Sequence, residues 1–171
     1  MKSLKGFKRV GDIDLYYEKK DSLETGAFGS VFTAVHRLTS TLCAVKIIKK
    51  DRVREREVLT ELMGNEISVL EEVSHPNIMR IFELMEDKSN YFIVTEFVRG
   101  GNLMDKLKKE GSLSESTTRT LIKQILMAMT YMHETKKISH RDIKLENVLL
   151  DKGDVVKLTD FGFASHFQPN E

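Results

Sequence analysis

The stretch His140-Arg141-Asp142-Ile143-Lys144-Leu145-Glu146-Asn147 is the part of the chain that decides its fold and its chemistry. It gathers carboxylates, cations and a carboxamide, and it runs directly into the apolar Val148-Leu149-Leu150. A charged loop that is fully exposed to solvent is not expected to run directly into a segment of apolar residues. The pattern predicts a polar loop that is fixed by buried neighbours.

Further along the chain, Asp160-Phe161-Gly162 follows a short apolar segment that begins at Val155. Asp160 therefore stands at the end of a predicted strand, and Gly162 frees the backbone after it. Carboxylate and carboxamide oxygens are suitable ligands for hard cations such as Mg²⁺. Together, Asp142, Asn147 and Asp160 can supply one general base and two oxygen ligands.

A glycine-containing turn is predicted near the N-terminus, between Leu23 and Val31. Gly26 and Gly29 would let backbone N–H groups approach phosphate oxygens without side chains in the way. The same residues are compatible with a plain β-hairpin. The turn is not the phosphate loop of GTPases, because no Gly-Lys-Ser or Gly-Lys-Thr follows it.

Lys46 lies in the middle of an apolar predicted strand, on the same face as Ala44. A buried ammonium group needs a carboxylate or a bound phosphate to compensate for its loss of water. Glu66, beside the apolar stripe of the next predicted helix, is a candidate partner. The alternative is a lysine whose charge reaches water at a strand edge, with Glu66 merely solvated.

The first half of the chain is predicted to be rich in strands. Residues 31–35 and 42–48 form one expected hairpin, and residues 78–85 and 91–97 form a second. Between them, apolar residues from Val58 to Val73 recur at three- and four-residue spacing, which predicts an amphipathic helix.

The second half is predicted to be helical. Leu103 to Lys109 is a short helix closed by Gly111, and Ser114 caps a longer one. The buried stripe expected on the longer helix consists of Leu121, Ile122, Ile125, Met129 and Met132. Strands followed by helices predict an α+β fold with a junction near residues 99–101.

The composition is typical of a globular protein, with 171 residues, 40% hydrophobic and 31% charged. Lys and Arg number 27 and Asp and Glu 26, so the net charge of +1 attracts neither nucleic acid nor an anionic membrane. No secretory signal or membrane-crossing run of about 20 apolar residues is recognisable. The only cysteine, Cys43, is interpreted as a buried structural thiol. We expect an intracellular, cytoplasmic protein without a membrane anchor.

In their order and spacing, these motifs resemble those of the eukaryotic protein kinases, of the serine/threonine type. The matching parts are a glycine-rich loop (Gly26, Gly29, Val31), a strand lysine (Ala44-Val45-Lys46), a helix carboxylate (Glu66), a catalytic loop (residues 140–147) and an Asp-Phe-Gly motif (residues 160–162). The resemblance runs from about Leu23 to Phe163. The segments 44–50 and 75–78 look like those of the calcium/calmodulin-dependent kinase group.

The resemblance implies a kinase-like α+β fold, with an antiparallel sheet lobe that carries one helix and an incomplete helical lobe. It also implies transfer of the γ-phosphoryl group of ATP, with Mg²⁺, to a serine or threonine hydroxyl of a protein substrate. An activating or regulatory protein is a further partner that it implies. Nucleic acid is not an expected partner.

Each matched residue takes a role that the resemblance implies. Lys46, positioned by Glu66, would hold the α- and β-phosphates of ATP. Asp142 would orient the substrate hydroxyl and accept its proton, and Lys144 would offset charge on the transferred group. Asn147 and Asp160 would bind Mg²⁺. The nucleotide pocket would consist of the gatekeeper Thr95, the backbone of Glu96 and Val98, and the apolar side chains of Leu23, Val31, Ala44 and Leu149.

Two features depart from the family pattern. Glu24 replaces the first glycine of the loop, which predicts weaker ATP binding, and the chain ends at Glu171, before the family's Ala-Pro-Glu motif. We therefore predict a partial kinase domain over residues 1–171. Its N-lobe and hinge would occupy about residues 14–98, and an incomplete C-lobe would occupy residues 99–171 and end in the early activation segment.

Two other functions stay open at this point. One is a non-catalytic, pseudokinase-like module that binds nucleotide and acts through a partner. The missing peptide platform favours it, whereas the intact Lys46, Asp142, Asn147 and Asp160 favour catalysis. The other is a metabolic small-molecule kinase, which would need no such platform, although Lys144 favours a protein substrate.

Overall fold

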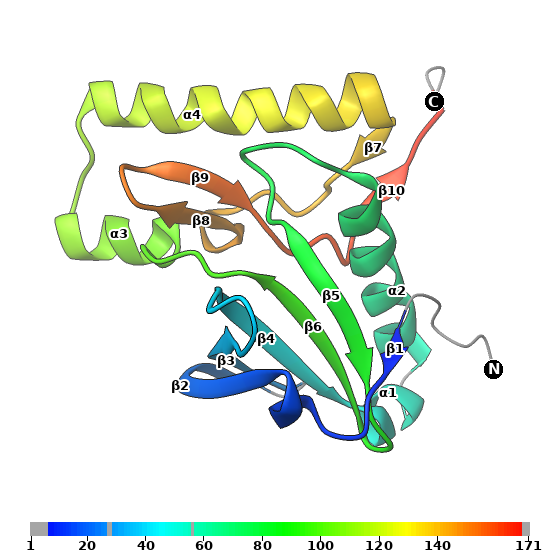
Figure 1. Cartoon of the computed structure of the whole chain (residues 1–171). Helices are drawn as coiled ribbons and strands as arrows, with labels where there is room; N and C mark the ends of the chain where they lie inside the picture. Colours follow the sequence, from blue (N-terminus) through cyan, green and yellow to red (C-terminus); the bar gives the residue numbers. More distant parts are fainter. Residues whose placement is uncertain (1–6, 27–28, 56, 169–171) are drawn as a thin grey trace. The chain divides into compact units, whose positions relative to one another are not determined.

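The computed structural model describes residues 7–26, 29–55 and 57–168 (Figure 1). The chain divides into two compact units. Unit 1 contains residues 1–61 and 80–97, and unit 2 contains residues 62–79 and 98–171. The predicted junction near residues 99–101 therefore lies close to the last boundary between the units. Strands dominate unit 1 and helices dominate unit 2, which confirms the α+β fold class.

Unit 1 is built on a six-stranded sheet in the order β1-β5-β6-β4-β3-β2 (Figure 1). Its strands are β1 (Lys8–Arg9), β2 (Tyr17–Gly26), β3 (Gly29–His36), β4 (Leu42–Lys49), β5 (Ile81–Glu86) and β6 (Asn90–Glu96). Neighbours pair antiparallel, except that β1 pairs parallel with β5. The remaining elements are the 3₁₀ turn η1 (Ile13–Leu15), helix α1 (Lys50–Glu55) and the start of helix α2 (Glu57–Glu72), which continues into unit 2.

Both predicted hairpins are present, and the predicted amphipathic helix is α2. The second hairpin begins at Ile81 rather than at Ile78. The reason is that residues 77–79 belong to unit 2, where Ile78 forms an isolated bridge with Leu158 and Met79 N donates to Leu158 O at 2.9 Å.

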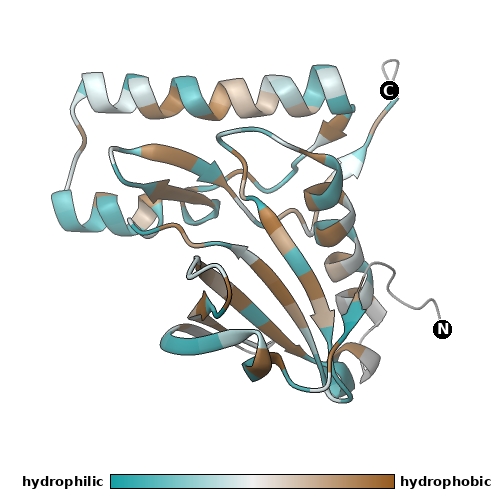
Figure 2. Ribbon diagram, viewed as in Figure 1, coloured by the Kyte–Doolittle hydropathy of each residue, from teal (hydrophilic) through white to brown (hydrophobic). Residues whose placement is uncertain are grey.

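The two faces of the unit 1 sheet differ in character. Phe32, Val45 and Val94 pair across three strands and are fully buried on one face. This face holds the core of unit 1, formed by Val10, Ile13, Tyr17, Phe32, Ala34, Cys43, Val45, Met85, Phe92 and Val94. Figure 2 shows the matching hydrophobic colouring along β4, β5 and β6. Because side chains alternate along a strand, the neighbours of these residues point to the opposite face.

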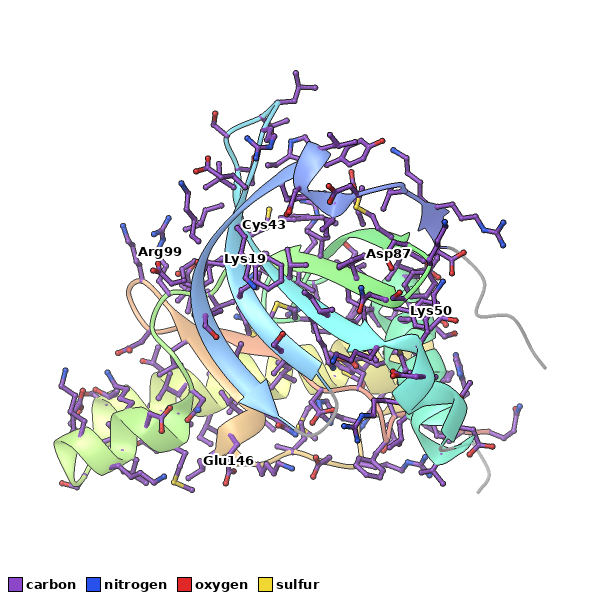
Figure 3. The ribbon with its side chains drawn as sticks, turned by 90° about the horizontal axis from the view of Figure 1, so that it is seen from below. Lys19, Cys43, Lys50, Asp87, Arg99 and Glu146 are labelled. Carbon is purple, nitrogen blue, oxygen red and sulfur yellow. The ribbon has the colours of Figure 1, made fainter. Side chains whose placement is uncertain are left out.

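Cys43 is free and buried in this core, as predicted (Figure 3). Burial, with a smaller contribution from Glu83, raises the pKa of its thiol. A thiol with a raised pKa is a poor nucleophile at neutral pH, so Cys43 has a packing role.

The side chain of Lys50 connects the start of α1 to the turn between β5 and β6. Its Nζ donates to Glu86 Oε2 at 2.8 Å and to the Asp87 carbonyl oxygen at 2.6 Å. The same ammonium lies 4.8 Å from the centre of the Tyr91 ring. Figure 3 shows Lys50 and Asp87 together at the end of the sheet. The side chains of Lys50 and Glu86 are mostly shielded from solvent, so their ion pair helps to fix the position at which β4 ends.

Unit 2 combines helices with two small antiparallel sheets, β8–β9 and β7–β10. Its elements, after the end of α2, are α3 (Leu103–Glu110), α4 (Glu115–Thr130), the π-helical turn η2 (Tyr131–Lys136), β7 (Ile138–Ser139), the 3₁₀ turn η3 (Leu145–Asn147), β8 (Val148–Asp151), β9 (Val155–Leu158) and β10 (Ser165–His166). Helix α4 runs along the β8–β9 hairpin (Figure 1), and Gln124 Oε1 accepts from Val156 N at 3.0 Å.

The predicted closing glycine, Gly111, and the predicted cap, Ser114, are confirmed, but the buried stripe predicted on α4 is partly wrong. Gly111 follows α3 with φ 76°, and the Ser114 side chain accepts from Thr117 N. Ile122 is 48% exposed, whereas Leu121 and Ile125 are buried. Each helical residue is turned by about 100° from the one before it, so Ile122 lies outside the line of buried positions. That line consists of Leu121, Ile125, Ala128 and Met132, and Met129 is only half-buried.

Among the described residues, no helix is both long and apolar enough to cross a membrane.

Candidate active site

Asp142 is the centre of a hydrogen-bonded group in the polar loop between β7 and η3, within unit 2. Its Oδ2 accepts from Lys144 Nζ at 2.7 Å and from Asn147 Nδ2 at 2.9 Å. Asn147 Nδ2 also donates to the backbone carbonyl of Asp142 at 2.9 Å. Three side chains that the sequence singled out are therefore brought together.

The electrostatics of this group keep Asp142 ionised. The hydrogen bond from Lys144 is the main reason that the pKa of the Asp142 carboxyl is lowered, and Asn147 adds to it while burial opposes it. The pKa of Lys144 is raised, first by Asp142 and to a smaller extent by Asp160. The Asp142 side chain keeps 23% of its exposure, so this carboxylate still reaches solvent.

Replacing Lys144 by methionine is expected to raise the pKa of the Asp142 carboxyl, because the largest lowering influence is removed. The carboxylate would then become protonated at a higher pH than in the wild type. Carboxyl-carbon NMR titration of both proteins measures this directly. Lys152→Met, at an exposed lysine in the β8–β9 turn, is the control and should leave the titration of Asp142 unchanged. An identical titration in the Lys144 variant would show that the ion pair is unimportant.

His140 fixes the loop from inside the protein. It is 1% exposed, its ring nitrogen Nε2 lies 3.1 Å from the Thr159 carbonyl oxygen, and its Nδ1 accepts from Asp142 N at 3.3 Å. The carbonyl can only accept, so the proton sits on Nε2 and the ring is neutral. Burial lowers the pKa of His140, in agreement with this assignment. The imidazole thus ties the Asp142 loop to the residue before Asp160.

Asp160 lies two residues beyond the end of β9, in a turn where the residues on both sides of it are held by contacts. Its φ is 62°, and Arg141 in the polar loop has φ 63°. Non-glycine residues in this left-handed region are uncommon and often occur at functional sites. On one side Thr159 N donates to the Asn147 carbonyl at 3.1 Å. On the other, Phe161 is fully buried with its ring 4.7 Å from that of His140.

In unit 1, four of the predicted nucleotide residues share the sheet face opposite the core. Val31 pairs with Lys46, and Ala44 pairs with Thr95, so the four side chains form two adjacent rows. All four are half-buried. One lysine among small and apolar side chains on a half-buried face is suited to binding a flat apolar ring with an attached anion.

The predicted glycine-rich loop connects β2 and β3. Gly26 pairs with Gly29 across the turn, and residues 27 and 28 lie outside the described part of the chain. Gly29 has φ 154°, and a Cβ atom there would lie far inside contact distance of the Ile47 carbonyl oxygen. Leu23 is 48% exposed and lies at an irregularity in the pairing between Ser22 and Glu24.

The predicted hinge residues follow the end of β6. Glu96 N donates to Arg80 O at 2.9 Å, and Glu96 Oε1 accepts from Arg80 N at 2.8 Å. Val98 begins the second part of unit 2 and is buried. Leu149, on β8, is half-buried and pairs with Lys157.

The predicted site residues therefore divide between the two units. Unit 1 contains Leu23, Gly26, Gly29, Val31, Ala44, Lys46, Thr95 and Glu96, and unit 2 contains Glu66, Val98, Asp142, Lys144, Asn147, Leu149 and Asp160. The pairing of Lys46 with Glu66 and the lobe boundaries stay predictions.

The described residues include no group of three or more His, Cys, Asp or Glu side chains that could hold a metal ion. Magnesium does not require one, because it is usually bound by one or two protein carboxylates together with substrate phosphates and water. The Asp160 carboxylate and the Asn147 amide oxygen are hard donors of this type. The donor chemistry of unit 2 therefore fits Mg²⁺.

Comparison with known proteins gives consistent matches. Residues 17–171 match the protein kinase domain family. Serine/threonine-protein kinase SIK1 of Mus musculus is 40% identical over 163 residues, which are 95% of this chain and 20% of that protein. CBL-interacting protein kinase 11 of Oryza sativa subsp. japonica is 39% identical, over 87% of this chain and 29% of that protein. Calcium-dependent protein kinase 5 of Plasmodium berghei (strain Anka) is 39% identical, over 93% of this chain and 28% of that protein. The chain thus spans between a fifth and three tenths of the length of these relatives.

Proposed function

The chain belongs to the protein kinase domain family, and from this premise we propose that it carries the phosphoryl-transfer site of an ATP-dependent serine/threonine protein kinase. The observation that carries the proposal is the Asp142 carboxylate, held by Lys144 at 2.7 Å and by Asn147 at 2.9 Å. Phosphoryl transfer needs little covalent help from the protein, so positioned charges are the main contribution that a catalyst can make.

Asp142 acts on the acceptor hydroxyl in this proposal. Both of its bonds to Lys144 and Asn147 go to Oδ2, so we assign Oδ1 the serine or threonine hydroxyl. The hydroxyl oxygen forms a bond to the γ-phosphorus, and the bond from that phosphorus to the bridging oxygen of the departing ADP breaks. The hydroxyl proton moves to Oδ1 and then to solvent, which the partly exposed carboxylate reaches. Lys144 places a positive charge beside the transferred group.

Mg²⁺ and ATP are the proposed cofactors. Asn147 Nδ2 is engaged in two hydrogen bonds with Asp142, so the amide oxygen is the atom of this side chain that would hold a cation. With the Asp160 carboxylate it makes a set of oxygen ligands suited to Mg²⁺. When bound, the ion neutralises charge on the phosphates.

The nucleotide contacts in unit 1 are also proposals. We assign Lys46, paired with Glu66, to the α- and β-phosphates, and Thr95 to the gatekeeper position beside the adenine. The Glu96 N–H is bonded to Arg80 O, so the adenine contact of Glu96 is assigned to its carbonyl oxygen and a second contact to the Val98 backbone. Leu23, Val31, Ala44 and Leu149 are assigned to the faces of the adenine ring.

The partners proposed are a protein substrate and an activating or regulatory protein. An intracellular, cytoplasmic location is proposed because the single cysteine, Cys43, is a free buried thiol, in keeping with a reducing compartment.

ATP with Mg²⁺ is expected to stabilise the chain against heat, and Lys46→Met is expected to remove most of that gain. Ligand at 100-fold above its Kd adds about 2.7 kcal/mol to the free energy of unfolding. Thermal unfolding of the wild type and the variant, with and without Mg·ATP, measures the difference. Lys49→Met, at an exposed position of the same strand, is the matched control and should keep the wild-type shift. Equal shifts in all three proteins would rule out Lys46 as a phosphate contact.

A further inference from the structure

Asn65 on helix α2 makes a hydrogen bond to the turn that contains Asp160, and the site described above does not use it. Asn65 Nδ2 donates to the backbone carbonyl of Gly162 at 3.3 Å, and both residues belong to unit 2. The Asn65 side chain is exposed, whereas Gly162 is buried. A side chain on a helix thus reaches a buried backbone group far away in the sequence.

The same part of α2 packs against this turn. A Cβ atom built on Gly162 would lie 3.6 Å from both Cβ and O of Leu62, one helical turn before Asn65. It would lie 3.6 Å from Asp160 Oδ1 as well. A side chain at position 162 would therefore lie in contact with the helix and with the Asp160 carboxylate, so the turn runs close to α2 at this point.

Asp160 is held at both of its flanks by side chains from different elements. Before it, the Thr159 carbonyl lies 3.1 Å from His140 Nε2 in the catalytic loop. After it, the Gly162 carbonyl accepts from Asn65. Between these anchors, Asp160 itself has φ 62°, a conformation that the backbone keeps only where its surroundings impose it.

We propose that Asn65 is a positioning residue, which fixes Gly162 and thereby presets the Asp160 carboxylate for the magnesium ion of the nucleotide. The inference rests on the proposed function, because it assigns Asp160 to the metal. In this proposal Asn65 touches neither the metal nor the substrate. It acts only through the backbone of the turn.

A second contact from α2 to the same segment supplies a control. Glu72 lies on α2, seven residues after Asn65, and its Oε2 is 3.1 Å from Nε2 of His166 on β10. The side chains of His166 and Glu72 are 57% and 38% exposed, and exposed pairs of this kind contribute little. Glu72→Gln removes charge from the segment without touching the turn at Asp160.

The first experiment measures hydrogen exchange of the Ala164 amide, which donates to the Phe161 carbonyl at 2.9 Å inside the turn. No nucleotide is present. Asn65→Leu keeps the size of the side chain but removes the donor, and exchange should accelerate about 3- to 10-fold, the range for one lost hydrogen bond. Asn65→Ala is the second loss variant, Asn65→Gln should restore slow exchange, and Glu72→Gln should leave it unchanged. Unchanged exchange in both loss variants overturns the proposal.

The second experiment titrates Mg²⁺ at fixed ATP and follows nucleotide binding to the full chain. In the loss variants the Mg²⁺ concentration at half-saturation should rise about 3- to 10-fold, while binding of metal-free ATP stays at the wild-type level. Asn65→Gln and Glu72→Gln should behave as the wild type. Faster exchange with an unchanged Mg²⁺ requirement would make Asn65 a structural residue only and overturn the proposal. Metal-independent binding, or none, by the wild type contradicts the proposed function itself, while the exchange result still tells whether Asn65 holds the turn.

Discussion

Replacing Asp142 by asparagine is expected to lower the rate of phosphoryl transfer to a protein or peptide hydroxyl by about 10²- to 10⁴-fold, the usual contribution of a general base. The asparagine oxygen can still accept from Lys144 and Asn147, so the geometry of the loop survives while the proton acceptor is lost. Affinity for Mg·ATP should stay close to that of the wild type, because Asp142 is assigned to the acceptor hydroxyl rather than to the nucleotide. Transfer from radiolabelled ATP and equilibrium binding of Mg·ATP are measured on the same preparations.

The matched control for this variant is Asp151→Asn. Asp151 is also a half-buried carboxylate of unit 2, but it lies at the end of β8, where it accepts a 3.4 Å hydrogen bond from Arg99 N. Transfer by this control should equal that of the wild type. If Asp142→Asn lost nucleotide binding as well as transfer, the roles assigned to Asp142 and to the metal ligands would have to be exchanged.

Gly29→Ala is expected to lower the free energy of unfolding by about 2–4 kcal/mol, from backbone strain and steric overlap together. The added Cβ would meet the Ile47 carbonyl oxygen on the neighbouring strand β4, and a backbone oxygen in a sheet cannot move aside as a flexible side chain can. The φ of 154° at this position is a second obstacle for any residue other than glycine. Urea unfolding should show a lower midpoint with an unchanged slope.

Gly11→Ala is the control for this substitution. A Cβ there meets nothing within 4 Å, and unit 1 contains both glycines. Its effect should be close to zero or slightly stabilising, since alanine restricts the unfolded chain. Equal stability of the two variants would mean that the β3–β4 pairing relaxes at Gly29 and that glycine is not required there.

The strands and helices follow from local patterns, and these patterns were sufficient for most of the fold. The β3–β4 hairpin has continuous β-branched runs, α2 has helical spacing, and α4 has the Ser114 cap. The sequence gives no comparable signal for β1, whose two residues are exposed and pair only with β5. The exposure of Ile122 could not be predicted either, because it is settled by which side of α4 the β8–β9 hairpin occupies.

The chemistry of the loop was predictable, but its supporting contacts were not. Asp142, Lys144 and Asn147 lie within one short stretch, so a local pattern reveals them. Asn65 and Gly162 meet only because the chain folds back over a long distance, and an exposed asparagine on a helix is common. The neutral tautomer of His140 likewise depends on the Thr159 carbonyl, which no motif marks.

The double hydrogen bond of Asn147 determines which residues position 147 can accept. Asparagine and aspartate are both good magnesium ligands, yet only the amide can donate to the two oxygens of Asp142. An aspartate at this position would set two carboxylates face to face, and one of them would take up a proton to relieve the repulsion. The shared proton would then lie on Oδ2 and make the Asp142 carboxyl a weaker base, although its Oδ1 has to accept a proton during transfer. Asn147→Asp is an apparently conservative exchange. It would replace a carboxylate that is always ionised by a pair of carboxyl groups whose protonation depends on pH.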